Sequence, residues 1–357
     1  MDRIKEKLES IESVSAERVE FFRQYWDGLV HPTGSLGDLE EIGIKLSAVY
    51  GEVPQNLEKK ATLVMCSDNG VIEENISSSP KILTRLLALE MVEGITGVNA
   101  LSKAAGADVI VVDLGIEDFE GHPDIIDRRI SNGTRNLMQV AAMSYDQALE
   151  SIQIGINLGE EMIRQGYTVL GTGELGMGNT TTSALVIKAL TGAPTDQVLG
   201  LGSGVDDRQL ANKRQVIDQA MTVRRPDKND PVDILAKLGG YDIGAIAGVF
   251  IAGAAHDIPV VIDGIISAAG ALLAYSLQPA CKDYMFPSHI AKENGNRVAV
   301  EAMGLKGYLD LDMRLGEGSG CPLFFQIMDA SLACMNQMSK FENTTIQNTL
   351  INIRDKK

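Results

Sequence analysis

The residues with the clearest chemical potential lie in one glycine-rich stretch, 171–183, which reads Gly-Thr-Gly-Glu-Leu-Gly-Met-Gly-Asn-Thr-Thr-Thr-Ser. An apolar run precedes it and apolar residues with helical spacing follow, so the pattern predicts a strand, a glycine turn and a helix start. Such a turn presents free backbone N–H groups to an anion, and Asn179 or a threonine can cap the helix. Glu174 lies within the predicted turn. A phosphate-binding turn that contains an acid predicts chemistry on a phosphorylated substrate.

Two other interpretations fit the same glycines. Gly171, Gly173 and Gly176 match the dinucleotide fingerprint, which would make the chain a nucleotide-dependent oxidoreductase, and Asp196 follows twenty residues after Gly176. That fingerprint needs its acid at the end of a second strand, whereas Asp196 follows a predicted loop. The other alternative is a purely structural turn, which the neighbouring acid and hydroxyl residues make less favourable.

A second glycine cluster, Gly202-Ser203-Gly204, offers N–H groups and a hydroxyl to a phosphate or a ribose. Lys213 follows on the helix predicted over residues 207–221 and is a candidate cation for the phosphate. The alternative is a capped helix that carries a solvated lysine.

A third cluster places Arg314, Gly316 and Glu317 among further glycines, just before the apolar residues 321–325. A carboxylate with apolar neighbours has a raised pKa and can serve as a general base. A surface loop capped by a glutamate is the alternative.

Asp263-Gly264 adds a fourth loop, in which Asp263 is placed to accept hydrogen bonds from ribose hydroxyls. Several loops rich in glycine and hydroxyl groups favour one composite phosphoribose site. Ser288-His289 follows a weaker strand pattern, and we expect His289 to be a hydrogen-bonded structural histidine.

Composition excludes several classes of function. The chain has 357 residues and a formal net charge of −16, which argues against a nucleic-acid surface, so an anionic substrate needs local donors. The four cysteines are widely spaced, which predicts a reduced, cytoplasmic setting.

The only D-x-D, Asp310-Leu-Asp312, has no supporting ligands nearby, and we expect neither a metal nor a cofactor. No apolar run is long enough to predict a membrane span, and the charged start does not resemble a signal peptide.

Short apolar runs separated by helical segments predict a parallel, Rossmann-like α/β sheet flanked by helices. The expected strands are 61–66, 108–115, 167–171 and 258–264, with a weaker one at 284–289; the expected helices between them are 80–105, 146–165, 180–191, 207–221, 231–238 and 264–277. Ligands bind at the carboxyl ends of such strands. Those ends carry Asp68, Asp113, Glu174, Asp263 and Ser288. Residues 1–58 and 321–357 are expected to form a small helical domain, and residues 59–320 the large one.

Residues 173–183 and 314–320 closely resemble signatures of the nicotinate-nucleotide:dimethylbenzimidazole phosphoribosyltransferase family, and residues 32–40 resemble its early Pro-x-Gly-Ser-Leu-Gly segment. The resemblance covers most of the chain. It implies transfer of the phosphoribosyl group of nicotinate mononucleotide to a lower-ligand base for cobamide assembly. It also implies a parallel α/β domain with a small helical domain, and a dimer.

By this resemblance, Glu317 is the general base and Glu174 is a second active-site carboxylate. The acceptor pocket would include Ser79, Leu86 and Leu175. The phosphoribosyl group would be held by Gly176, Gly178, Asn179, Thr180, Gly202, Ser203, Gly204, Lys213, Asp263, Gly264, Ser288, Arg314 and Gly316.

The chain also departs from the family. Its first loop reads Asp68-Asn69-Gly70 instead of Asp-His-Gly, His31 replaces a lysine, and residues 86–89 are apolar where the family is more polar. These changes leave the acceptor open between a benzimidazole, a purine and a phenol, and the assembly between a homodimer and a heterodimer with a homologous chain. A non-catalytic partner subunit is a further alternative, although such a subunit has no reason to keep both acids.

Overall fold

The computed structural model of the chain describes residues 2–200, 207–346 and 352–353. Its centre is a six-stranded sheet in which every pairing is parallel, in the order β3-β2-β1-β4-β5-β6. The strands are β1 (Lys60–Ser67), β2 (Ala107–Gly115), β3 (Ile126–Asp127), β4 (Val169–Leu175), β5 (Val260–Ile262) and β6 (Met285–Pro287). The expected α/β fold class is confirmed. Only β3 was not predicted, because two residues are too few to form a recognisable pattern.

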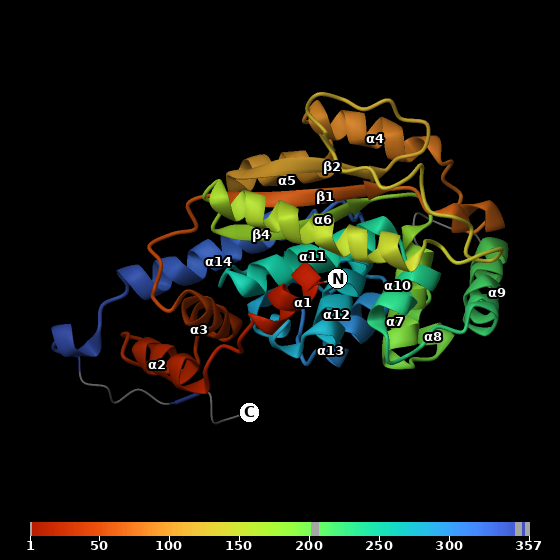
Figure 1. Cartoon of the computed structure of the whole chain (residues 1–357). Helices are drawn as coiled ribbons and strands as arrows, with labels where there is room; N and C mark the ends of the chain where they lie inside the picture. Colours follow the sequence, from red (N-terminus) through yellow and green to blue (C-terminus); the bar gives the residue numbers. More distant parts are fainter. Residues whose placement is uncertain (1, 201–206, 347–351, 354–357) are drawn as a thin grey trace.

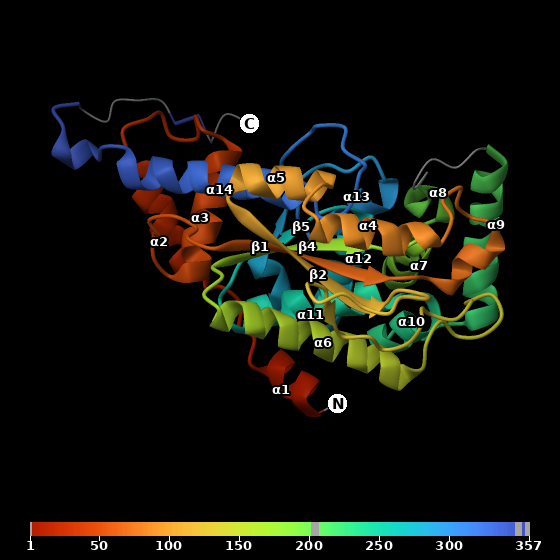
Figure 2. The same ribbon diagram turned by 90° about the horizontal axis from the view of Figure 1, so that it is seen from above.

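Helices cover both faces of the sheet (Figure 2). One face contacts α11 (Tyr241–Ala255) and α12 (Ile265–Leu277), and α6 (Tyr145–Arg164) packs on α11. The other face contacts α4 (Ile82–Val92), α5 (Gly97–Ala105) and α14 (Gly320–Gln337). The central strands are therefore enclosed on both faces, which explains why they are continuous apolar runs in the sequence.

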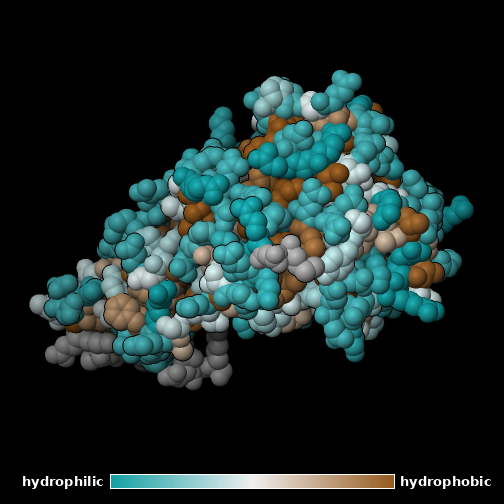
Figure 3. Space-filling model, in the orientation of Figure 1, coloured by the Kyte–Doolittle hydropathy of each residue, from teal (hydrophilic) through white to brown (hydrophobic). Residues whose placement is uncertain are grey.

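Helix α11 was not predicted. It is buried along almost its whole length, so it has no polar face and shows no amphipathic period. Its glycines allow α6 to approach closely: a Cβ on Gly248 would lie 2.1 Å from the carbonyl oxygen of Ile152. No helix within the described residues is long and apolar enough to cross a membrane. Hydrophilic side chains cover most of the face shown in Figure 3.

A second group of helices lies toward the carboxyl ends of the strands, at the right of Figure 1. It comprises α7 (Asn179–Thr191), α8 (Thr195–Val198), α9 (Asp207–Arg224) and α10 (Pro231–Leu238). Helix α13 (Asn294–Ala302) packs between this group and α12. Short 3₁₀ helices, η1 (Gly70–Glu74), η2 (Pro279–Tyr284) and η3 (Phe341–Asn343), complete the structure.

The opposite end of the molecule holds α2 (Ala16–Asp27), α3 (Asp38–Tyr50) and the end of α14, which share a small core around Trp26 and Met335 (Figure 1). Helix α1 (Asp2–Glu9) instead contacts α11. The start of α14 also packs on the sheet, where Cys321 and Phe325 lie against Gly171. Helix α14 thus joins the two regions, and the predicted division into residues 1–58 with 321–357 and residues 59–320 stays a prediction.

Candidate active site

One pocket opens at the carboxyl ends of the central strands. Twelve of the predicted site residues line it: Ser79, Glu174, Leu175, Gly176, Gly178, Asn179, Thr180, Lys213, Gly264, Arg314, Gly316 and Glu317. They come from segments that are far apart in the sequence and meet only because parallel strands end at one edge of the sheet.

Strand β4 runs further than the sequence predicted. It extends to Leu175, so Glu174 belongs to the strand and the turn is confined to Gly176, Met177 and Gly178. Gly171 and Gly173 are therefore strand residues rather than turn residues. The two glycines were assigned to a turn because glycine is disfavoured in strands. It occurs there mainly where another backbone approaches closely.

Such an approach is present on β4. A Cβ on Gly173 would lie 2.5 Å from the carbonyl oxygen of Glu317, and one on Gly171 would lie 2.6 Å from Cβ of Cys321. On the opposing segment, a Cβ on Gly316 would lie 2.5 Å from Oε1 of Glu174. We call residues 314–320 the Glu317 loop. The glycines of the strand and of the loop allow the two backbones to touch, and this contact places Glu317 beside Glu174.

Glu317 has a backbone conformation that side-chain-bearing residues rarely adopt. Its φ is 63°, and Gly316 and Gly318 on either side have φ values of 82° and 85°. A non-glycine residue in this region stores strain and requires support from its surroundings. The Glu317 side chain is only 9% exposed, and its Oε2 accepts a hydrogen bond from the backbone N–H of Val98 at 3.4 Å, in the first turn of α5. Burial raises the pKa of Glu317, which makes its carboxylate a stronger base.

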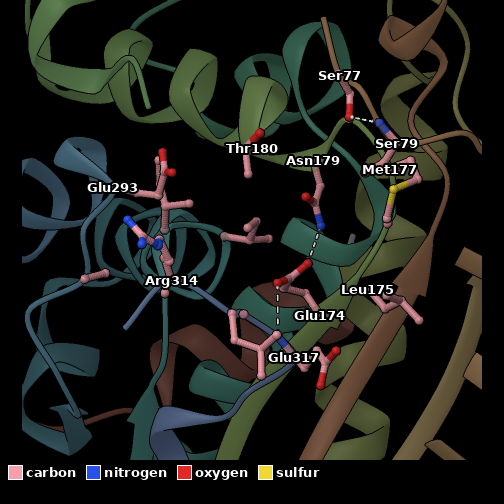
Figure 4. Close-up of a pocket in the computed structure, with 18 of the residues that line it drawn as sticks. Ser77, Ser79, Glu174, Leu175, Met177, Asn179, Thr180, Glu293, Arg314 and Glu317 are labelled. Atoms are coloured by element: carbon pink, nitrogen blue, oxygen red, sulfur yellow. Dashed lines mark hydrogen bonds between the residues drawn. The ribbon is translucent and has the colours of Figure 1, made fainter. Parts of the chain in front are cut away.

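Glu174 is the second carboxyl group of the pocket (Figure 4). Its Oε2 accepts a hydrogen bond from the side-chain amide of Asn179, and its Oε1 accepts one from the backbone N–H of Glu317 at 3.4 Å. Burial, reinforced by the nearby carboxyl group of Asp242, raises the pKa of Glu174 to about 8. Asp242 is itself fully buried, and burial raises its pKa to about 7. Glu174 therefore largely retains its proton at neutral pH.

The start of α7 supplies polar groups to the pocket. The helix is preceded by Gly178 with φ of 91°, which has no side chain to cap the first-turn amides. The sequence had predicted that Asn179 or a threonine would cap α7. Asn179 is instead its first residue, and its side chain bonds Glu174.

Lys213 is a buried cation beside this helix. It is 1% exposed, and its Nζ donates to Oγ1 of Thr180 at 3.0 Å and to the carbonyl oxygen of Gly200 at 3.1 Å. Burial lowers its pKa to about 8, so it is mostly charged at pH 7. An anion that binds near Thr180 would meet this charge directly.

Three predicted site residues do not line the pocket, and three others lie outside the described residues. Leu86 is 43% exposed and does not line the pocket; Leu83 and Leu87, one turn apart on α4, line it instead. Asp263 and Ser288 lie behind the wall: Asp263 accepts from backbone N–H groups of the Glu317 loop, and Oγ of Ser288 donates to the carbonyl oxygen of Ile262 at 2.7 Å. Gly202, Ser203 and Gly204 lie outside the described residues.

Some lining residues were missed, chiefly Leu83, Leu87, Met177 and Glu293. The i, i+4 spacing of Leu83 and Leu87 could have identified them as one helix face. His289 also lines the pocket, and its Nδ1 lies 2.9 Å from Oγ of Ser288, in agreement with the hydrogen-bonded histidine expected there.

The pocket has two chemically different ends (Figure 4). Arg314 and Glu293 lie at one end, and Ser77, Ser79 and Leu175 lie at the other, with Glu174 and Asn179 between them. Leu83, Leu87 and Met177 also line the pocket and are apolar. Within the described part of the chain, no cluster of His, Cys, Asp and Glu side chains could hold a metal ion. This arrangement can bind a charged sugar phosphate at one end and a flat apolar molecule at the other, with two carboxyl groups at the junction.

Comparisons with known proteins agree with this geometry. A phosphoribosyltransferase family model matches residues 11–346. The chain is 43% identical over 348 residues to the nicotinate-nucleotide–dimethylbenzimidazole phosphoribosyltransferase of Clostridium perfringens, covering 98% of this chain and 96% of that protein. It is 40% identical over 348 residues to the Escherichia coli protein of the same name, covering 97% of each. The crystal structure of CobT from Thermus thermophilus superposes with a TM-score of 0.89 at 34% identity, covering 93% of this chain and 99% of that one. The chain therefore belongs to the nicotinate-nucleotide–dimethylbenzimidazole phosphoribosyltransferase family.

Proposed function

We propose that this chain transfers the phosphoribosyl group of nicotinate mononucleotide to 5,6-dimethylbenzimidazole or a related base. The products are nicotinate and an α-riboside 5′-phosphate used in cobamide synthesis. The observation that carries the proposal is the single pocket in which Glu317 and Glu174 lie between a charged end and an apolar end.

The charged end suits the ribose phosphate. The protein is strongly acidic overall, so the phosphate must be held by local donors. Lys213 and Arg314 are such donors, and the N-terminus of α7 favours an anion.

The apolar end suits the acceptor. Leu83, Leu87 and Leu175 offer a hydrophobic wall to a flat ring, while Ser79 offers a hydroxyl group. The two curated relatives described above are named for dimethylbenzimidazole, and this supports a benzimidazole acceptor over a phenolic one.

The reaction needs little from the enzyme at the leaving group. The nicotinate ring of the nucleotide is already a pyridinium cation, so when the bond from C1′ to its nitrogen breaks, the electron pair neutralises the ring without a proton. The acceptor nitrogen attacks C1′ from the opposite face, which inverts the centre from β to α. The proton on the acceptor's other nitrogen goes to the carboxylate of Glu317, a step that benefits from a base with a raised pKa.

Glu174 has a different task. Because its pKa is about 8, it is largely protonated in the empty pocket at pH 7. Its two oxygens contact Asn179 and the backbone of Glu317, so it orders the centre of the pocket. When the nucleotide binds with its pyridinium ring near Glu174, the positive charge of that ring favours loss of this proton, and the resulting carboxylate would stabilise positive charge that develops at C1′.

A competition experiment tests the proposal. The purified chain is given nicotinate mononucleotide together with 5,6-dimethylbenzimidazole, adenine and phenol, and mass spectrometry identifies the riboside phosphates formed. We expect the benzimidazole riboside phosphate to dominate and nicotinate to appear in equal amount. A dominant phenolic product would overturn the acceptor assignment, and no release of nicotinate would overturn the activity.

We also infer that the chain acts as a dimer in the cytoplasm. All four cysteines are free, which suits a reducing compartment. Leu315, on the pocket rim, is 56% exposed; it lies against Gly97, close to Ile95, which is 71% exposed. Exposed apolar side chains beside a pocket favour coverage by a partner. Light scattering of the purified chain should give twice the chain mass. A monomeric mass that doubles only with a co-expressed homologue would indicate a heterodimer instead of a homodimer.

A further inference from the structure

Asp263 follows β5 and lies directly behind the Glu317 loop. We propose that Asp263 is a positioning residue that fixes this loop, and so the base, rather than a ligand of the ribose. The inference rests on the proposed function, because it assigns the role of Asp263 in the same reaction.

Both oxygens of the Asp263 carboxylate are engaged by the loop. Oδ1 accepts a hydrogen bond from the backbone N–H of Gly320 at 2.7 Å, and Oδ2 accepts one from that of Gly318 at 3.1 Å. The residue is 2% exposed and does not line the pocket. Hydrogen bonds to a charged acceptor are stronger than those between neutral groups. Because Asp263 is buried behind the pocket wall, a ribose hydroxyl in the pocket does not reach these oxygens.

Gly320 begins α14, and the residue before it, Ser319, makes no side-chain capping bond. Asp263 therefore supplies, from another part of the chain, the anion that a helix N-terminus favours. The fit is close: a Cβ on Gly320 would lie 2.8 Å from Oδ1 of Asp263 and 2.3 Å from Nδ1 of His289.

The backbone of Asp263 is also held in place. Its N–H donates to Oγ of Ser267 at 3.0 Å, and its carbonyl oxygen accepts from Nδ2 of Asn296 at 3.3 Å. The backbone of Asp263, at the end of β5, is thus anchored to α12 and α13, and its carboxylate holds the loop in a fixed position relative to them.

The consequence falls on Glu317. Its own N–H contacts Glu174, and the next N–H, that of Gly318, contacts Asp263, so carboxyl groups hold the strained residue from both sides. Loss of the Asp263 contact would allow the loop to relax and the base to leave its position. A displacement of about 1 Å in a catalytic group costs about 100-fold in rate.

The test is an Asp263→Asn variant, whose side-chain amide would face a loop N–H and remove one of the two contacts. We expect kcat to fall about 100-fold while KM for nicotinate mononucleotide changes less than about threefold. We then place the same substitution in a Glu317→Gln background. If Asp263 acts through Glu317, the second substitution has little further effect on kcat. A rise in KM for the nucleotide in both backgrounds would show ribose binding and overturn the proposal.

Asp113→Asn is the matched control. Asp113 is also 2% exposed at the end of a strand, and it does not line the pocket. Its Oδ1 accepts from the N–H groups of Gly115 and Ile116, and its Oδ2 pairs with Arg129 at 2.7 Å, so the variant loses at least as many contacts as Asp263→Asn. We expect Asp113→Asn to keep kcat within about threefold of the unaltered chain. If its kcat falls as far as that of Asp263→Asn, general destabilisation explains both decreases and the proposal is overturned. If Asp263→Asn does not fold, Gly320→Ala replaces it. The added Cβ would lie 2.3 Å from Nδ1 of His289, 2.6 Å from Oγ of Ser288 and 2.8 Å from Oδ1 of Asp263, so the loop must move away from an intact Asp263. We expect kcat and KM to respond in the same way, and an unchanged kcat would overturn the proposal.

Hydrogen exchange separates failure of the inference from failure of the proposed function. Peptides that cover the Glu317 loop should exchange at least about tenfold faster in Asp263→Asn, or in Gly320→Ala, than in Asp113→Asn, whether or not the unaltered chain turns over nicotinate mononucleotide. Equal exchange rates would overturn the positioning role of Asp263 even if the enzyme is active. If exchange differs as expected but the unaltered chain releases no nicotinate, the positioning role stands and the proposed function is refuted.

Discussion

The contact between Gly173 and the Glu317 loop allows a quantitative prediction. Gly173 has an ordinary strand conformation, so Gly173→Ala introduces no backbone strain and its cost is one of space. The new Cβ would lie 2.5 Å from the carbonyl oxygen of Glu317, which is about 0.9 Å short of the 3.4 Å at which ordinary van der Waals contact begins. The opposing atoms are backbone, which cannot rotate away. The Glu317 loop must therefore retreat by about 1 Å.

A retreat of this size should lower kcat about 100-fold, equivalent to about 2.7 kcal/mol in the activation free energy. KM for nicotinate mononucleotide should change little, because Lys213 and α7 are not displaced and the clash falls on Glu317 and Gly318 rather than on Arg314, at the start of the loop. The assay is steady-state release of nicotinate with saturating dimethylbenzimidazole.

Gly171→Ala is the control for this prediction. Gly171 lies on the same face of β4, but its Cβ would meet Cys321 and Phe325 of α14 instead of the Glu317 loop. We expect it to lower the melting temperature while kcat stays within about tenfold of the unaltered chain. Equal kcat in Gly173→Ala and the unaltered chain would refute the argument that this contact places the base.

Three further predictions concern other parts of the pocket. Lys213→Met, which keeps the apolar length of the buried side chain, should raise KM for nicotinate mononucleotide about tenfold or more and leave KM for the acceptor unchanged; a shift in the acceptor KM alone would contradict the phosphate role. Glu174 holds its proton up to about pH 8 when folded and only to about pH 4.5 when unfolded, so its contribution to stability is complete below pH 4.5 and is lost as pH rises toward 8. As pH rises across this window, the unaltered chain should therefore lose up to about 1.4 kcal/mol of unfolding free energy per pH unit relative to Glu174→Gln. Urea unfolding measures this difference, and a difference that does not change with pH would be inconsistent with the buried acid. Leu87→Gln should raise KM for dimethylbenzimidazole several-fold without changing KM for the nucleotide, and steady-state kinetics showing the reverse would move the acceptor to another wall.

Local sequence pattern identified the sheet and the edge at which the site lies. The apolar runs end in Asp68, Glu174 and Asp263, and the structure brings all three ends to one side of the sheet. The glycine loops around Gly176, Gly264 and Gly316 also line one pocket, whereas the predicted loop at residues 202–204 lies outside the described residues. Both inferences depend on features that are local in the sequence, namely strand patterning and turn chemistry.

Tertiary contacts could not be derived in this way. Whether a glycine forms a turn or admits another backbone depends on what lies opposite it, and for Gly173 this is a residue 144 positions later, Glu317. The same holds for Asp263, whose partners lie in the Glu317 loop. Leu86 was chosen over Leu87 because the phase of a helix relative to a pocket is set by packing, and α11 was missed because a fully buried helix has no polar face.

The central claim is that Glu317 takes the proton of the acceptor as the phosphoribosyl group moves. The most direct measurement is the single-turnover rate of nicotinate release by Glu317→Gln, with both substrates saturating. We predict a fall of at least about 100-fold, with the dissociation constant of nicotinate mononucleotide within about threefold of its original value. A rate within about threefold of the unaltered chain would contradict the assignment of the base.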